Sequence, residues 1–352
     1  MRAVRIDSFG GPEVLVPVDV PDPVPGPGEV LVRIAAAGVN RADALLRAGL
    51  YHRAGRPPLV PGVEAAGVVV EVGEGVTEVV PGQRVMALDG GKSSGFYARL
   101  ATVPATHLVV LPEAVDLTRA AALPVAWLSA WYCLRRLARV TKDDTVVVKA
   151  AASGVGTAAV QIAAETGARV IALAGSAEKA AWAGEFGADV TLDTSAPAWA
   201  GEFGADVTLD TSAHPDDAEV EEVLRLTDGR GADVVLDTVG GRAFGRSLRE
   251  VAHGGRVVAL ANVALEPSTV DTRDFYPKNA SILGFQLTNL QIHGYDPRPD
   301  LRELAERVAA GVYRVPIETV VPLEEARAAH ERLERRDNRG KIVLAVGPDI
   351  SK

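Results

Sequence analysis

Hydrophobic and polar positions divide the chain into two kinds of segment. Up to about residue 120, short apolar runs are separated by glycine and proline, a spacing typical of a compact, partly closed β-domain. From Thr145 onwards, strand-like and helix-like patterns alternate, which is typical of an α/β protein with a doubly wound parallel sheet. The predicted strands are Ala3–Ile6, Val30–Ala36, Ala66–Val72, Arg84–Leu88 and Tyr97–Val103 in the first segment, and Val146–Lys149, Val170–Ala174, Asp233–Thr238 and Arg256–Leu260 in the second.

The segments on either side of the alternating region complete a plan of two domains. A helical pattern runs from Leu117 through Ala138 and leads into that region. After about residue 280, a mixed segment ends in a predicted helix, Leu323–Arg335, and a predicted strand, Lys341–Ala345, which we expect to return to the first domain. The sequence therefore predicts one domain from residues 1–120 and 280–352, and another from residues 121–279.

A turn of small residues after the first strand of the alternating region is the candidate nucleotide site. The strand Val146–Lys149 is followed by Ala150–Gly156 and then by a helical pattern up to Ala164. Exposed amides and the dipole at a helix start favour a pyrophosphate, and glycines allow close approach of the backbone. The spacing departs from a strict G-x-G-x-x-G motif, so an ordinary turn whose small residues serve packing is the alternative. The candidate contacts are Ser153, Gly154, Val155 and Gly156.

The end of the next strand favours a phosphorylated cofactor. A site for NAD places an acid about twenty residues past the turn, where it binds the ribose hydroxyls. Here the strand ends at Ala174 and is followed by Gly175 and Ser176, with Lys179 one helical turn on. A neutral tip beside a cation suits a 2′-phosphate, so NADPH is predicted rather than NADH. Ser176 as a helix cap and Lys179 as a solvated residue are the alternatives, and both are compatible with the binding roles.

Composition narrows the classes of partner. The 352 residues are 47% hydrophobic and 24% charged, with a net charge of −9, which argues against nucleic acid as a ligand. No apolar stretch reaches the roughly 20 residues needed to span a bilayer, and the first residues show no signal or transit pattern. We therefore expect no membrane partner and a cytoplasmic location. The single cysteine, Cys133, excludes a disulfide framework within the chain and a zinc site with several thiolates.

A 17-residue tandem duplication interrupts the alternating region. The segment Trp182–Pro197 recurs as Trp199–Ala213, with His214 in place of the last proline. Each copy holds the end of one helix and one strand, and two copies are too few for a solenoid. Only one copy can occupy the natural strand position. We expect Val190–Asp193 of the first copy to lie in the sheet and the second copy to be a surface excursion, with the reverse assignment as the alternative.

Short motifs in a fixed order resemble a known family. They are Gly38–Asp43, Gly49–Tyr51, Pro61–Val69, Val72–Gly73, Pro81–Val85, Ser153–Gly156, Gly187–Asp189, Asp237–Gly241 and Gly340–Leu344. Together they are similar to the zinc-independent quinone oxidoreductase, or zeta-crystallin-like, family of the medium-chain dehydrogenases/reductases. The resemblance implies a GroES-like β-rich domain made from both termini and a Rossmann domain between them. It also implies NADPH as cofactor, a quinone or another conjugated carbonyl as acceptor, and a homodimer formed through the Rossmann sheet edge near Ile282–Leu287.

Residue types at two positions argue against a catalytic metal ion. Zinc-dependent relatives need a thiolate where this chain has Asn40, and an imidazole where it has Val63. Neither residue supplies such a ligand. Glu64 remains, but a single carboxylate is better interpreted as a structural hydrogen-bond acceptor. We therefore expect no metal site.

The resemblance also assigns roles to individual side chains. It implies that Asn40 lies near the nicotinamide, with a simple turn residue as the alternative, and that Tyr51 lines the substrate cleft. Tyr51 is the candidate proton donor, with a purely aromatic wall as the alternative. Ser129 is expected to approach the carboxamide. Further expected cofactor contacts are Val239, Gly240, Asn262 and Lys341, together with Thr194 or Thr211 at the place where much of the family has a tyrosine for the 2′-phosphate.

Two other functions fit the same residues. An enoyl-thioester reductase uses the same hydride step on an unsaturated acyl chain, and an NADPH-binding sensor or structural protein would use the nucleotide site without turnover. The presence of both Asn40 and Tyr51 favours an enzyme over the second alternative.

Overall fold

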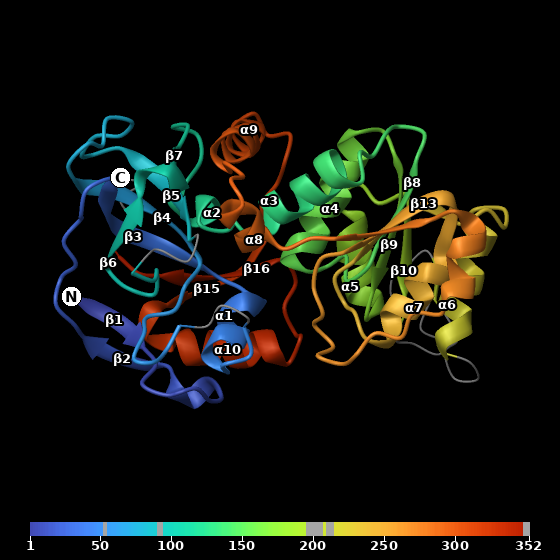
Figure 1. The fold of residues 1–352 in the computed structure, drawn as a ribbon, viewed down its shortest axis with the longest axis horizontal. Coiled ribbons are helices and arrows are strands. Elements are labelled where there is room, and N and C mark those ends of the chain that lie inside the picture. The colour runs from blue at the N-terminus through green and yellow to red at the C-terminus, as the bar shows by residue number, and fades with distance from the viewer. Residues whose placement is uncertain (52–54, 90–93, 195–206, 209–214, 348–352) are drawn as a thin grey trace. The chain divides into compact units, whose positions relative to one another are not determined.

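The computed structural model describes residues 1–51, 55–89, 94–194, 207–208 and 215–347 (Figure 1). The chain forms two compact units, one made of Met1–Leu128 with Leu287–Lys352 and the other of Ser129–Gln286. The predicted boundary at 279/280 differs from this division, because the strand β14 (Ser281–Gly284) pairs with the sheet of the second unit. That strand therefore belongs to the second unit.

The first unit is built on a sheet with the strand order β15-β16-β3-β4-β5-β7, and β6 pairs with β3. Its last strand, β16, pairs in antiparallel with β3, so residues from the two ends of the chain lie side by side in one sheet. The strands are β1 (Arg2–Arg5), β2 (Val16–Asp19), β3 (Glu29–Val39), β4 (Glu64–Val72), β5 (Arg84–Leu88), β6 (Leu100–Pro104), β7 (Leu108–Val110), β15 (Ile317–Pro322) and β16 (Lys341–Ala345). The helices are α1 (Arg41–Arg47), α2 (Leu117–Ala120), α8 (Leu287–Ile292), α9 (Arg298–Ala309) and α10 (Ala326–Glu334).

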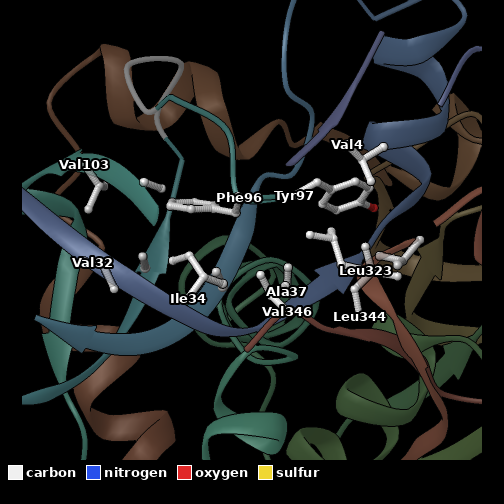
Figure 2. Close-up of a cluster of buried hydrophobic side chains, with 14 of the residues drawn as sticks. Val4, Val32, Ile34, Ala37, Phe96, Tyr97, Val103, Leu323, Leu344 and Val346 are labelled. Atoms are coloured by element: carbon white, nitrogen blue, oxygen red, sulfur yellow. The ribbon is translucent and has the colours of Figure 1, made fainter. Parts of the chain in front are cut away.

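The core of the first unit draws on segments far apart in the sequence. Figure 2 shows Ile34 of β3, Phe96, and Leu344 of β16 within one cluster of buried side chains. Alternating apolar positions on the strands supply most of this cluster, as expected for a sheet with one face against the core. The core therefore fixes the position of β16, whose first residue is Lys341, relative to β3.

The second unit is a seven-stranded sheet in which every pair of neighbouring strands is parallel, with the order β11-β10-β9-β8-β12-β13-β14. The three valines of β8 are fully buried, as expected for a strand covered on both faces. The other strands are β9 (Arg169–Ala174), β10 (Val190–Asp193), β11 (Val207–Thr208), β12 (Ala232–Asp237) and β13 (Val251–Ala259), with β8 at Thr145–Val148. The helices are α4 (Gly154–Glu165), α5 (Ala177–Gly184), α6 (Pro215–Leu226) and α7 (Arg242–Glu250).

Both copies of the duplication contribute a strand to this sheet. β10, from the first copy, pairs with β9 in the natural position, as predicted. β11, from the second copy, pairs in parallel with β10, with Leu192 opposite Val207, and extends the sheet at its edge. The prediction of a surface excursion is therefore wrong for residues 207–208. The rest of the second copy lies outside the described residues.

The predicted helix Leu117–Ala138 is not continuous. It consists of α2, then α3 (Ala126–Trp131), and a π-helical segment at Tyr132–Leu137. Pro124 lies between α2 and α3, and a proline has no N–H to continue an α-helical hydrogen-bond ladder. Within the described residues, no helix is both long and apolar enough to span a bilayer.

Candidate functional site

The carboxyl ends of β8, β9, β10, β12 and β13 lie at one edge of the second unit's sheet, because these strands are parallel. In open sheets of this kind, ligands bind at that edge, where the strand order reverses direction. The reversal here falls between β8 and β12. The candidate nucleotide contacts predicted from the sequence follow these strand ends.

The turn after β8 is shaped for a pyrophosphate. Ser153 is the N-cap of α4, and its Oγ accepts a hydrogen bond of 3.0 Å from the N–H of Gly156. The N–H groups of Gly154 and Val155 open the helix, so the helix itself supplies no acceptor for them. A Cβ atom at Gly156 would lie 2.3 Å from the carbonyl oxygen of Ala150, so only glycine fits there. The turn therefore presents N–H donors and the positive end of a twelve-residue helix.

The ends of β9 and β10 lie together beside this turn. Ser176 is the N-cap of α5, and its Oγ accepts a hydrogen bond of 3.2 Å from the N–H of Lys179. The hydroxyl of Thr194 donates to the carbonyl oxygen of Ala174 at 3.1 Å, which places it next to the end of β9. The bond to Lys179 shows that Ser176 caps the helix, as predicted. A hydroxyl oxygen has two lone pairs, so the second one is able to accept a hydrogen bond from a ligand. Thr211, the other candidate at this place, lies outside the described residues.

The loops after β12 and β13 form a third part of the edge. Asp237 Oδ1 accepts the N–H groups of Val239 and Gly240 at 2.8 and 2.9 Å. Gly240 has a φ of +71°, and a Cβ there would lie 2.7 Å from Asn262 Oδ1. The structure thus brings Val239, Gly240 and Asn262 together, and Asp237 holds the first two in place. Ser129, the remaining predicted contact in this unit, is a buried residue of α3.

Three predicted residues of the first unit form one buried network. Lys341 Nζ donates to Glu64 Oε1 at 2.6 Å, to Asn40 Oδ1 at 2.7 Å and to the carbonyl oxygen of Val39 at 3.1 Å. Asn40 Nδ2 donates to Glu64 Oε1 at 2.8 Å. Glu64 also accepts from the N–H of Val125 at 2.7 Å and is fully buried. This network confirms that Glu64 is a structural hydrogen-bond acceptor.

The network also defines what Asn40 and Lys341 are able to do. Asn40 is the N-cap of α1, and both polar atoms of its side chain have partners inside the protein. All three N–H donors of the Lys341 ammonium group have acceptors as well. In this structure Lys341 orients Asn40. A direct contact of either side chain with the cofactor stays a prediction.

Tyr51 has a polar partner that the sequence did not reveal. Its hydroxyl lies 3.3 Å from Thr288 Oγ1 of α8, and either atom is able to donate. The two residues are 237 positions apart, so no local pattern connects them. Tyr51 is half-buried. Its hydroxyl therefore has the hydroxyl of Thr288 within hydrogen-bonding distance.

A buried polar group of three residues lies behind α1. The hydroxyl of Tyr97 lies 3.4 Å from Asp43 Oδ2 and 3.1 Å from His330 Nε2. Burial raises the pKa of Asp43 to about 7 and lowers the pKa of His330 to about 3. His330 is therefore neutral at pH 7, and Asp43 keeps its proton to a higher pH than an exposed carboxyl group. Asp43 Oδ2 also accepts the N–H of Asn40 at 2.8 Å, so this group supports the start of α1.

The carboxylate beside Asn40 is already bound within the protein. Glu64 accepts hydrogen bonds from Asn40, Lys341 and the N–H of Val125. In the parts of the chain that the structure describes, no group of three histidine, cysteine, aspartate or glutamate side chains is arranged to hold a metal ion.

Comparisons with known proteins agree with this arrangement. Residues 26–113 match a family model described as the alcohol dehydrogenase GroES-like domain, and residues 154–217 and 203–344 match models described as zinc-binding dehydrogenase. The quinone oxidoreductase of Sus scrofa is 30% identical over 352 residues, which cover 98% of each chain. This chain belongs to the quinone oxidoreductase family of the medium-chain dehydrogenases/reductases. The family predicted from the sequence is confirmed.

Solved structures of this quinone oxidoreductase family show the same fold. The Escherichia coli quinone oxidoreductase, solved as a complex with NADPH, has a TM-score of 0.83 and 29% identity, covering 98% of this chain and 100% of that chain. A mycobacterial protein, also solved as a complex with NADPH, has a TM-score of 0.84 and 31% identity with the same coverage. The predicted fold class, a Rossmann domain with a GroES-like domain, is therefore confirmed.

Proposed function

We propose that this oxidoreductase, which uses NADPH, transfers hydride to a quinone or another conjugated carbonyl compound without a bound metal ion. The hydrogen-bond network of Asn40, Glu64 and Lys341 supports a reaction without a bound metal ion. The only carboxylate beside Asn40 in that network is bound by an ammonium group 2.6 Å away, and the amide of Asn40 is bound on both of its polar atoms. These side chains hold one another rather than offering electron pairs to a cation.

The proposal for the cofactor rests on the edge of the second unit's sheet. The N–H groups of Gly154 and Val155 and the dipole of α4 suit the pyrophosphate. Because Gly156 has no Cβ, the helix start packs closely against Ala150 in the turn. Ser176 and Lys179 at the end of β9 suit a 2′-phosphate. Relatives of known structure carry NADPH. When bound, NADPH supplies the hydride, that is, one proton with an electron pair.

Tyr51 is the proposed source of the second proton. Reduction of a quinone to a hydroquinone takes one hydride and one proton, and a conjugated carbonyl compound supplies its own electron sink. The hydroxyl of Tyr51 donates the proton to the oxygen that gains negative charge, and the hydroxyl of Thr288, 3.3 Å away, orients it. A tyrosine that only shapes the cleft would make no such contribution.

The activity is tested by following NADPH oxidation with a naphthoquinone and, in parallel, with a crotonyl thioester. We expect turnover with the quinone, turnover that persists after treatment with a chelator, and no stoichiometric zinc in the purified protein. Faster turnover of the thioester would instead favour an enoyl-thioester reductase. Tight NADPH binding with no turnover across a panel of acceptors would favour a sensor or structural protein.

The role of Tyr51 is tested separately. Removal of a general acid lowers kcat by about 100-fold or more, so Tyr51→Phe is expected to lower kcat by that amount. Thr288→Val is the matched control, because it removes the partner of the hydroxyl but keeps the hydroxyl itself, and it is expected to lower kcat by about threefold. A kcat for Tyr51→Phe within about threefold of the wild type would leave Tyr51 as a cleft wall.

The proposal also includes a homodimer formed through β14. This strand is the last in the sheet of the second unit, and Ile282 on it is 38% exposed. An open parallel edge with an apolar side chain is suited to pairing with a second copy, consistent with the predicted segment Ile282–Leu287. Sedimentation velocity is expected to show a dimer that Ile282→Lys converts to a monomer. The cytoplasmic location expected from the sequence is tested by cell fractionation.

A further inference from the structure

Four charged side chains gather inside the second unit, directly behind the nucleotide turn. Lys149, the residue after β8, is 2% exposed, and its Nζ binds Glu219 and lies 2.9 Å from Glu250 Oε1. Arg246 Nε lies 2.8 Å from Glu219 Oε2. Glu219 is 4% exposed and Glu250 is fully buried. The group, which we call the Lys149 cluster, thus joins the end of β8 to α6 and α7.

The charges of the Lys149 cluster depend on one another. Burial opposes the charge of Lys149, but Glu219 and Glu250 outweigh it and raise the pKa of that ammonium group. Burial raises the pKa of Glu250 to about 8. Burial acts in the same direction on Glu219, yet Lys149 and Arg246 hold its pKa below the usual range. Glu219 therefore lies between two cations that favour its ionised form, and Glu250 keeps its proton to a higher pH than an exposed carboxyl group.

The backbone of Lys149 is the start of the nucleotide turn. Its N–H donates to the carbonyl oxygen of Leu236 at 3.1 Å, and its own carbonyl oxygen accepts from Thr238 Oγ1 at 3.3 Å. The next residue, Ala150, has a φ of +51°, which an L-residue adopts only when its surroundings hold it there. The Lys149 side chain therefore lies on the backbone unit directly before the first residue of the turn that presents Gly154 and Val155.

The Lys149 cluster also connects this turn to α6, the helix that follows the duplication in the sequence. Glu219 lies on α6, the helix that follows the second copy along the chain, and Arg246 and Glu250 lie on α7. The contact with Glu219 joins α6 directly to the residue that follows β8. The side chain of Lys149 thus binds α6 and α7, and its backbone begins the turn.

We propose that Lys149 is a positioning residue for NADPH: the contacts of its ammonium group with Glu219 and Glu250 set the start of the turn that binds the pyrophosphate. This inference rests on the nucleotide site of the proposed function and adds a residue to it. Lys149 does not touch the cofactor. It acts through the backbone of Ala150 and the residues that follow.

The first test is a titration of the full-length protein with NADPH, followed by cofactor fluorescence. Lys149→Met keeps the length of the side chain, removes the ammonium group and leaves Glu219 paired with Arg246. We expect it to weaken NADPH binding by about tenfold, and NADH binding by the same factor, because the pyrophosphate is common to both. With the quinone acceptor, kcat at saturating NADPH is expected to stay within about twofold while KM for NADPH rises. Lys149→Arg is expected to recover most of the lost affinity.

A milder pair of variants keeps the proposal testable if Lys149→Met does not fold. Glu219→Asp withdraws the carboxylate from Lys149 by one methylene, and we expect NADPH binding about threefold weaker. Glu222→Asp is the matched control, because Glu222 is on the same helix but pairs at 2.6 Å with the exposed Arg225, so the same shortening is expected to leave NADPH binding unchanged.

The outcomes separate this inference from the proposed function. Wild-type affinity in Lys149→Met, or equal effects of Glu219→Asp and Glu222→Asp, would overturn the positioning role while the nucleotide site stands. A wild-type protein that binds neither NADPH nor NADH would overturn both proposals.

Discussion

Replacement of Lys341 by methionine is the sharpest test of the buried network in the first unit. Lys341 is 4% exposed and Glu64 is fully buried, so the substitution leaves a carboxylate in the interior without its cation. Removal of one partner of a buried ion pair costs roughly 3–5 kcal/mol. Glu64 keeps the donors Asn40 Nδ2 and Val125 N–H, so we expect a loss near the lower end, about 3 kcal/mol in the free energy of unfolding. For a unit of this size that corresponds to a fall in Tm of roughly 6–12 °C.

The assay is thermal and urea unfolding followed by circular dichroism, which needs neither cofactor nor substrate. Glu64→Gln is expected to cost a similar amount, and the double variant less than the sum, because the pair is lost only once. Arg327→Met is the matched control. Arg327 and Glu331 form an exposed pair on α10 at 2.9 Å, and its loss is expected to cost less than about 0.5 kcal/mol. A loss for Lys341→Met below about 1 kcal/mol, or strict additivity in the double variant, would refute the reasoning.

Three further predictions concern the second unit. Gly156→Ala places a Cβ 2.3 Å from the carbonyl oxygen of Ala150, so it is expected to destabilise the protein by about 1–3 kcal/mol and to weaken NADPH binding. Gly245→Ala in α7 is the control, because its Cβ would meet nothing nearer than the carbonyl oxygen of Thr269 at 3.8 Å. Unfolding and NADPH titration check both variants. Burial raises the pKa of Glu250 from 4.5 to about 8, so the folded state keeps a proton that the unfolded chain releases, and the free energy of unfolding falls between about pH 5 and pH 8 by up to roughly 1.4 kcal/mol per pH unit. Glu250→Gln is expected to flatten this fall in urea unfolding at pH 5, 6, 7 and 8, and parallel profiles would contradict it. Deletion of residues 182–198 leaves one complete copy joined directly to Ala181, and we expect NADPH affinity within about threefold of the wild type; loss of binding would show that both copies are needed.

The fold was predictable because its signals are local. The apolar run of β8, the small-residue turn and the helical pattern of α4 are adjacent in sequence, so periodicity and turn chemistry identified them. The motif order then gave the family. The helical pattern from Leu117 concealed the break at Pro124. The predicted boundary at 279/280 left β14 outside the Rossmann domain, although the resemblance had implied a sheet edge of that domain near Ile282–Leu287.

The polar networks could not be predicted in the same way. Lys149 lies 70 residues from Glu219 and 101 from Glu250, and Lys341 lies 277 from Glu64. Pairings over such separations leave no periodic signal. One clue was present: Lys149 ends a run of three buried valines, and a lysine at such a position needs an anionic partner. The identity of that partner required the fold.

The placement of β11 shows how this sheet gained length. The second copy contributes β11, which pairs with β10 at the edge of the sheet. The order of β10, β9, β8, β12 and β13, whose ends form the nucleotide site, is not interrupted by it. Equivalent residues of the two copies therefore meet different surroundings, since β10 has a neighbouring strand on both sides whereas β11 has one on a single side.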